Sequence, residues 1–197
     1  MSNVQPSAAP IRGAQDQAGT LPRRSQPEAA RLPLHREAHA FVPAPARAVF
    51  ARLDDQTRLA EHMGRPSPMM GGGRMTYDFD EDRGQAVGSH IRMGGEAFGL
   101  RLFVDEVVTV REPPRRKLWR TTGEPRLIIM GAYEMGFAID EDPHGCDLQV
   151  WIDYALPDRG WARWVPGLAA LYARWCVRRM VSDAVRHFSV ASGARSA

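Results

Sequence analysis

The sequence has few cysteines and no apolar run long enough for a membrane-spanning helix. Only Cys146 and Cys176 occur among the 197 residues. They cannot build a disulfide framework, so each is expected to be a small buried apolar side chain. No stretch of about 18 apolar residues is present, which argues against a transmembrane helix. The first residues also lack the apolar segment of a secretory signal, so a cytoplasmic location is expected.

Aromatic residues are absent from residues 1–33, which consist largely of Pro, Ala, Gln, Ser and Arg. Such a segment buries too little apolar surface to offset its ordering entropy. The sequence therefore predicts a disordered tail at 1–33, one domain at 34–191 and a flexible C-terminus at 192–197. The net charge of +3 is mild and the composition ordinary, with 44% apolar and 25% charged residues. A domain of about 150 residues is large enough for a core and a ligand cavity.

Hydrophobic periodicity predicts an α+β domain with a strand first and a long helix last. A strand at 34–43 ends at prolines, and residues 46–55 place Val49, Phe50 and Leu53 on one helical face. A second short helix is expected to hold Leu59 and Met63. Apolar residues then alternate along six segments with turn-type joins, which is typical of an antiparallel meander. These segments are 74–82, 88–95, 100–112, 116–123, 127–142 and 146–157.

Residues 161–190 predict one long helix that needs an apolar groove to lie in. Its apolar residues recur at spacings of three or four. The predicted buried stripe is Trp164 or Val165, Leu168, Tyr172, Cys176, Met180, Ala184 and Phe188.

The order of these elements and four short motifs resemble a known superfamily. The motifs are FVPAPARAVFARLDD at 41–55, VGSHIRM at 87–93, VVTVREPPRRKLWRT at 107–121 and VWIDYALP at 150–157. Over residues 34–190 the chain resembles the START-like helix-grip (SRPBCC) superfamily, specifically its polyketide cyclase/dehydrase and lipid-transport branch. The resemblance implies a helix-grip fold. In this fold a curved antiparallel sheet of about seven strands wraps around a long C-terminal helix, and two short helices follow the first strand.

The resemblance further implies a hydrophobic cavity between the sheet and the long helix. Met and aromatic side chains are frequent on the predicted inner faces of the strands, and such side chains repack around varied ligands. For any one residue, the alternative of simply filling the core is favoured. The expected ligand-binding residues are Met75, Tyr77, Phe79, Leu102, Val104, Glu106, Tyr133, Met135, Phe137, Val150, Ile152, Tyr154, Leu168 and Tyr172.

Glu106 is the one carboxylate on the apolar face of the strand at 100–112, which carries Leu100, Leu102, Val104, Val108 and Val110. An unpaired charge in a dry core costs several kcal/mol, which leaves three interpretations. Glu106 faces a cavity and binds a ligand's polar end, pairs with Arg92 or Arg120, or is turned to solvent by a bulge. The second and third together are favoured, which makes Glu106 a structural residue.

No pattern predicts a metal, cofactor or catalytic site. The six histidines are scattered: His35, His39, His62, His90, His144 and His187. The glycines at 71–73 lack the Gly-Lys-Ser/Thr ending of a phosphate loop, and no Ser–His–Asp or Cys–His arrangement can be argued. No catalytic residue, metal or cofactor is therefore predicted.

Arginines and tryptophans gather in the region of the last predicted helix. Arg163, Arg174 and Arg178 share one side of it, and Trp161, Trp164 and Trp175 lie near them. Such a pairing suits lipid headgroups and suggests transient contact with a membrane surface. A solvated outer face with the tryptophans in the core is the favoured alternative.

The function expected from the sequence is binding or transfer of a hydrophobic small molecule that is lipid, quinone-like or polyketide-like. One alternative is an enzyme of the polyketide cyclase or aromatase type, which needs polar groups converging inside the cavity. A second alternative is a module that binds a protein partner. No nucleic-acid partner is expected, and a non-catalytic ligand-binding protein is favoured over an enzyme.

Overall fold

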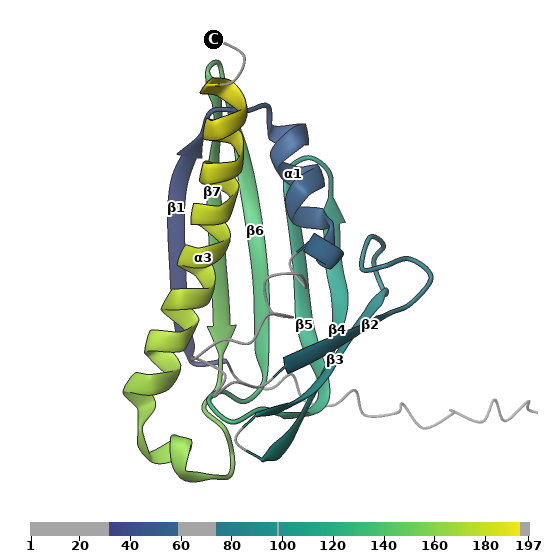
Figure 1. Cartoon of the computed structure of the whole chain (residues 1–197), viewed down its shortest axis with the longest axis vertical. Coiled ribbons are helices and arrows are strands. Elements are labelled where there is room, and N and C mark those ends of the chain that lie inside the picture. Colours follow the sequence, from purple (N-terminus) through teal and green to yellow (C-terminus); the bar gives the residue numbers. More distant parts are fainter. Residues whose placement is uncertain (1–31, 59–73, 98, 194–197) are drawn as a thin grey trace, which may run out of the picture.

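The computed structural model describes residues 32–58, 74–97 and 99–193. Seven antiparallel strands form one sheet in the order β1-β7-β6-β5-β4-β3-β2. Figure 1 shows the sheet curving around the helices. The strands are β1 (Leu34–Val42), β2 (Arg74–Phe79), β3 (His90–Ala97), β4 (Leu100–Glu112), β5 (Arg116–Arg126), β6 (Tyr133–Asp142) and β7 (Gly145–Tyr154).

Several of the predicted segments have different bounds in the structure. The segment expected as a strand at 127–142 pairs only from Tyr133 onward, because Gly131 donates its N–H to the carbonyl of Ala155 instead, at 2.9 Å. A Cβ at Gly131 would lie 2.7 Å from the carbonyl oxygen of Leu156, so only glycine fits this crossing. The second short helix begins at 56–58, while Leu59 and Met63 lie outside the described residues, as does the tail at 1–31.

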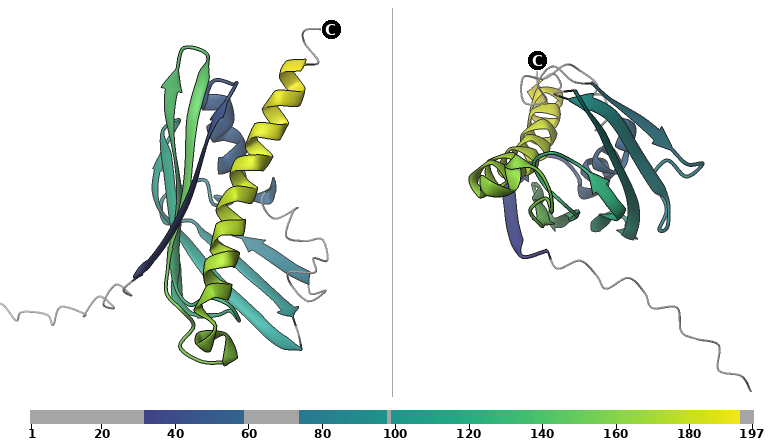
Figure 2. Two further views of the ribbon diagram at one scale, coloured as in Figure 1. Left: turned by 90° about the vertical axis from the view of Figure 1, so that its left-hand side faces the viewer. Right: turned by 90° about the horizontal axis from the view of Figure 1, so that it is seen from below.

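The helices pack on the inner face of the curved sheet. Helix α1 (Ala46–Asp54) places the ring of Phe50 edge-on against Phe137 of β6, with ring centroids 5.4 Å apart. Helix α3 (Pro166–Gly193) lies along β1 and β7, as Figure 2 shows. The described residues contain no helix with the length and apolar character needed to cross a bilayer.

The last helix begins later than predicted, and it buries a different face. Trp161–Trp164 form a short 3₁₀ turn, η2, and α3 begins only at Pro166, where a missing N–H costs no intrahelical bond. The buried face of α3 consists mainly of small residues that lie one position along from the predicted stripe: Ala169, Ala173, Val177 and Val181. Of the predicted stripe only Met180 and Ala184 are buried. The small side chains let α3 approach the sheet, and the larger Leu168, Tyr172 and Cys176 lie beside that contact, half-buried.

An irregularity in β4 changes which side chains face inward. The β4–β5 register shifts between Val108 and Val110, so the residue between them, Thr109, has no opposite residue on β5. Such a bulge reverses the alternation of side chains beyond it. Arg111, which strict alternation would place on the outer face, therefore comes to lie against helix α1, with its guanidinium 5.8 Å from the ring centroid of Phe50.

The burial of α3 can be tested with two matched substitutions. Val177 is 0% exposed and Val190 is 74% exposed on the same helix. Val177→Ala removes two buried methyl groups and should lower the free energy of unfolding by about 2 kcal/mol. Val190→Ala should change it by less than about 0.5 kcal/mol. Urea denaturation measures both, and equal effects would contradict the phase described for α3.

Candidate functional site

Glu106 points inward from the middle of β4. Its side chain is 4% exposed between the buried Val104 and Val108. The hydroxyl of Tyr133 on β6 donates a hydrogen bond to its carboxyl oxygen Oε1. The interpretation that a bulge turns Glu106 to solvent is therefore wrong.

The expected pairing of Glu106 with an arginine is also wrong. Arg92 lies on the outer face, where its Nε is 3.6 Å from Oδ2 of Asp105. Arg120 is exposed and its charge acts on Glu134, the residue opposite it on β6. Both arginines alternate with residues of the inner face and so point away from Glu106. Of the three interpretations, the one in which Glu106 binds the polar end of a ligand remains, and it stays a prediction.

The pKa of Glu106 follows from its surroundings. Burial raises the pKa to about 7, although the Tyr133 hydrogen bond and the charge of Lys117 both act to lower it. Burial, together with the charge of Glu106, raises the pKa of Tyr133 and of Tyr77. The two phenols therefore stay protonated at neutral pH, and the carboxyl takes up or releases a proton there.

Three strands and one helix contribute side chains to one polar cluster. Glu106 comes from β4, Tyr133 from β6 and Tyr77 from β2, and α3 contributes Tyr172 with Cys176. The Cys176 thiol raises the pKa of Tyr172, and so do burial, Tyr77 and Glu106, which places these groups within electrostatic reach of one another. We call these five residues the polar cluster.

The expected ligand-binding residues divide into two groups by burial. Members of the first group are half-buried at the border of the core: Tyr77, Phe79, Leu102, Leu168 and Tyr172. Members of the second group are buried in it: Val104, Met135, Phe137, Val150, Ile152 and Tyr154. The side chain of Met75 lies outside the described residues. The first group therefore offers accessible apolar surface next to the polar cluster, and its role in binding stays a prediction.

Tyr154 is a fully buried residue whose side chain has a polar atom without a partner in the described part of the chain. It is 0% exposed at the end of β7, opposite Tyr133 in the β6–β7 register. Its hydroxyl has no hydrogen-bond partner among the described residues. A buried hydroxyl without a partner costs free energy, and a bound molecule or a water relieves that cost.

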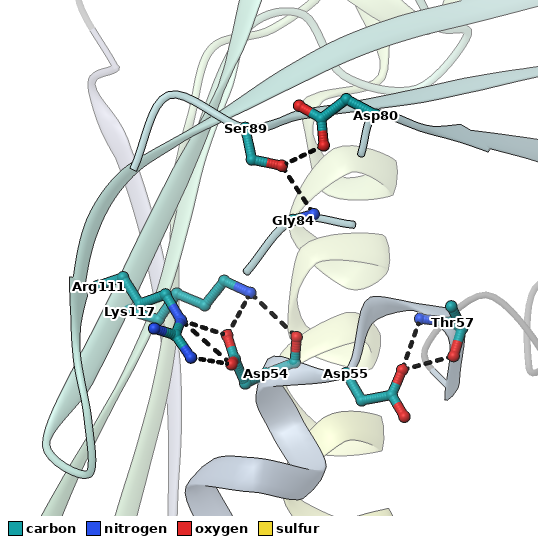
Figure 3. Close-up of polar contacts among 8 residues, drawn as sticks. All are labelled: Asp54, Asp55, Thr57, Asp80, Gly84, Ser89, Arg111 and Lys117. Carbon is teal, nitrogen blue, oxygen red and sulfur yellow. Dashed lines mark hydrogen bonds and ion pairs between the residues drawn. The ribbon is translucent and has the colours of Figure 1, made fainter. Parts of the chain in front are cut away.

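A second group of buried charges, which the sequence analysis missed, borders the cluster. Lys117 of β5 is 0% exposed, and its Nζ lies 2.8 Å from Oδ1 and 3.2 Å from the backbone oxygen of Asp54 at the end of α1. Arg111 donates to the same carboxylate through Nη2 at 2.7 Å and Nε at 3.1 Å (Figure 3). We call Asp54, Lys117 and Arg111 the ion cluster. Lys117 lies two positions before the buried Trp119 on β5, and so on the same face of the strand. This spacing was the signal in the sequence for an inward-pointing lysine.

Opposing effects set the ionisation of the ion cluster. Burial alone would raise the pKa of the Asp54 carboxyl, but the hydrogen bonds from Arg111 and Lys117 outweigh it and hold the pKa below its usual value. Burial lowers the pKa of Lys117, and Asp54 opposes that shift. Lys117 is also close enough for its charge to favour the ionised form of Glu106. The ion cluster therefore acts electrostatically on the polar cluster.

The connection between β2 and β3 is fixed next to the end of α1. Asp80 accepts hydrogen bonds from the Ser89 hydroxyl at 2.6 Å and from the His90 N–H at 2.6 Å. The Ser89 hydroxyl also accepts from the N–H of Gly84 at 2.7 Å, as Figure 3 shows. Gly84 has a φ of +74°, and a Cβ there would lie 3.0 Å from Gln56. Close packing of this loop on Gln56 therefore requires the glycine.

Solved structures share this architecture. Ara h 8.0201 aligns with 80% of this chain and 98% of its own, with a TM-score of 0.56 and 11% identity. The di-domain ARO/CYC BexL from the BE-7585A biosynthetic pathway aligns over 79% of this chain and 50% of its own, with a TM-score of 0.56 and 19% identity. The Polyketide_cyc-like protein Cgl2372 from Corynebacterium glutamicum aligns over 79% of this chain and 91% of its own, with a TM-score of 0.53 and 20% identity.

No protein-family model and no curated protein matches the sequence. Identities as low as those of the solved structures show a shared fold and not a shared activity. The helix-grip fold expected from the sequence is confirmed.

The ion cluster can be tested by removing its ammonium group. Lys117→Met keeps an unbranched side chain, one atom shorter, but leaves the Asp54 carboxylate with Arg111 alone. Losing one partner of a buried charge should lower the free energy of unfolding by about 3 kcal/mol in chemical denaturation. Arg116→Met is the control, because Arg116 is an exposed neighbour paired with Glu112 at 2.8 Å, and it should change little. Equal effects of the two changes would contradict the structural importance of the ion cluster.

Glu106 predicts a pH-dependent difference in stability. Its pKa is raised from 4.5 to about 7, so the folded state binds the proton more tightly than the unfolded chain. Its contribution to stability is therefore complete below about pH 4.5 and is lost as the pH rises to about 7. Glu106→Gln removes that loss. The free energy of unfolding of the variant, relative to that of the wild type, should therefore rise by about 3 kcal/mol when the pH is raised from 5 to 8.

Urea denaturation at the two pH values measures this gain. Glu81→Gln is the control, because Glu81 is an exposed carboxyl in the β2–β3 connection. Its effect on the free energy of unfolding should be the same at pH 5 and pH 8. A Glu106→Gln effect that does not depend on pH would show that the carboxyl titrates as it does in water.

Proposed function

We propose that the protein binds an apolar small molecule with one polar group, between the inner face of β2–β4 and helix α3. The observation that carries this proposal is the buried Glu106 carboxyl, held by the Tyr133 hydroxyl beside Tyr77 and Tyr172. A carboxyl in this position is costly for a domain that needs only a core, because apolar residues of the same size pack there without desolvation cost. Binding of a polar ligand group would explain why a carboxyl is present there.

The apolar part of the ligand would lie on the half-buried side chains next to the polar cluster. Tyr77 and Phe79 stack at 5.9 Å between ring centroids, and Leu102 lies half-buried two strands away on the same inner face. Flat rings stack on such a surface and chains pack along it, so lipid, quinone-like and polyketide-like compounds all suit it. Two of the solved neighbours, the di-domain ARO/CYC BexL and the Polyketide_cyc-like protein Cgl2372, add support for the polyketide-like class.

The polar end would be recognised by groups that both donate and accept hydrogen bonds. An ionised Glu106 accepts from a ligand hydroxyl, and a protonated one donates to a ligand carbonyl. The unpartnered hydroxyl of Tyr154 is the second group that is able to serve such a ligand. Phenols, enols and ketones therefore fit better than charged headgroups.

The second candidate function is catalysis of the cyclase or aromatase type. It is favoured by the pKa of Glu106 near 7, because a carboxyl that titrates at neutral pH is suited to take a proton from carbon and return it to oxygen. In this function Glu106 would remove a proton beside a ketone of the ligand, and the Tyr133 hydroxyl would orient the carboxyl. Turnover would then require the ionised carboxyl and fall as the pH drops below about 7.

Binding of a polar-ended ligand is tested with two probes that differ in one group. 1-Naphthol and 1-methylnaphthalene should both displace Nile red from the protein, and 1-naphthol should do so at about tenfold lower concentration because its hydroxyl bonds the carboxyl. Glu106→Met should abolish the tenfold preference and leave the displacement by 1-methylnaphthalene unchanged. Fluorescence titration measures both.

Glu134→Met is the matched control, because Glu134 follows Tyr133 on β6 and points to the outer face. It should keep the preference for 1-naphthol. Failure of every probe to displace Nile red, or a preference that survives Glu106→Met, would contradict the proposal. Native mass spectrometry of the protein purified from its own host should reveal a co-purified molecule of the proposed class.

A further inference from the structure

The turn before α3 holds large apolar side chains in solvent. Trp161 is 61% exposed and Trp164 is 82% exposed, contrary to the expectation that the tryptophans lie in the core. Their exposure is built into the turn, because the small Ala162 between them is the residue that η2 buries, at 1% exposed. Val165, which follows, is 46% exposed. Contiguous apolar surface of this kind on a folded domain marks an interaction site.

Further apolar side chains lie at the same end of the molecule. Leu100 and Phe103, at the start of β4, are 53% and 44% exposed. Figures 1 and 2 place the start of β4 and η2 at one end of the sheet, opposite the C-terminal end of α3. Aromatic and aliphatic side chains thus share this end.

Arginines line a groove on the exposed side of α3. A shallow groove of about 320 Å³ is lined by Leu171, Trp175 and four arginines, among them Arg174 and Arg178. The structure shows no ion pair for Arg174 or Arg178 within the described part of the chain. The other two, Arg179 and Arg186, share the carboxylate of Asp183. The groove therefore keeps a net positive charge.

The turn η2 itself also holds a cation next to an aromatic ring. The guanidinium of Arg163 lies 6.0 Å from the ring centroid of Trp164 and donates a hydrogen bond to the backbone oxygen of Asp158 at 3.0 Å. Tryptophan rings prefer the boundary between hydrocarbon and water, and arginine forms bidentate hydrogen bonds with phosphate. Both preferences are met at the headgroup level of a bilayer.

We propose that η2 and the N-terminal half of α3 dock on an anionic lipid bilayer. Trp161, Trp164 and Val165 would enter the interface, and Arg174 and Arg178 would contact lipid phosphates. The positive groove complements a negative membrane surface, and the aliphatic Val165 and Leu171 gain from acyl chains but gain nothing from a nucleic acid. This inference goes beyond ligand binding and holds whether or not the polar cluster binds a ligand.

The test is co-sedimentation of the full chain with vesicles. Vesicles of phosphatidylcholine with added phosphatidylglycerol should bind the protein, those of phosphatidylcholine alone should bind it much more weakly, and salt should weaken the binding. Arg174→Gln with Arg178→Gln should reduce binding to the anionic vesicles by about 25-fold, or about fivefold per arginine. Trp161→Ser with Trp164→Ser should reduce binding even at low salt, because the ring insertion is lost.

Two controls lie at the opposite end of the molecule. Val190→Ser replaces an exposed apolar residue near the end of α3, and Arg115→Gln replaces an exposed arginine in the β4–β5 turn. Both should bind vesicles as the wild type does. Thermal melting followed by circular dichroism should show an unchanged midpoint for every variant, and Trp164→Ser alone replaces the double change if that variant does not fold.

Equal binding to both vesicle types, or losses as large in the controls as in the arginine and tryptophan variants, would overturn the proposal. Binding of a single-stranded oligonucleotide in place of the vesicles would overturn it too. The Nile red titration reports separately on the interior. If the η2 and α3 variants lose vesicle binding while ligands still displace Nile red, the membrane function lies in η2 and α3. If the protein binds vesicles but no ligand displaces Nile red, only the proposed ligand binding at the polar cluster fails.

Discussion

The pairing of Lys117 with Asp54 is the constraint on which the rest of the structure depends. An ammonium group with no exposure requires an anion within reach, and the only carboxylate in contact with it among the described residues is at the last turn of α1. The pair therefore fixes the end of α1 over β5, and Arg111 completes it from β4. With α1 held there, Phe50 covers Phe137 and closes this end of the inner face, while Tyr77, Phe79 and Leu102 on β2 and β4 stay half-buried.

Polarity changes in steps across the inner face. The ion cluster keeps its charges, Glu106 titrates near neutral pH, the phenols around it stay neutral, and the residues beyond them are apolar. A graded environment of this kind orients a molecule with one polar end, because only one orientation satisfies both ends. Binding and proton transfer thus need the same arrangement, and the two proposed functions differ only in whether the bound molecule has an acidic C–H within reach of Glu106.

Most of the fold could be predicted from the sequence, because it depends on periods of two and of three to four that act locally. Alternation placed Glu106 on the same face as Val104 and Val108, but it left the orientation of the side chain open, and the two favoured interpretations were wrong. What could not be predicted depends on single residues: the bulge at Thr109 that reverses Arg111, and the choice of Ala169 and Ala173 over Leu168 and Tyr172 as the buried face of α3. The latter choice is made by how closely the helix approaches the sheet, and periodicity does not report that distance.

The pairing of β1 with β7 also has a consequence for how the chain folds. Leu34 pairs with Tyr154 and Val42 pairs with Cys146. The first strand of the domain therefore pairs only after the last strand has been synthesised. During synthesis, β1 emerges long before β7, its one neighbour among the described strands, exists, whereas β2 to β7 pair with strands next to them in sequence. The sheet is therefore completed late, and folding combines fast hairpin formation with one slow long-range closure.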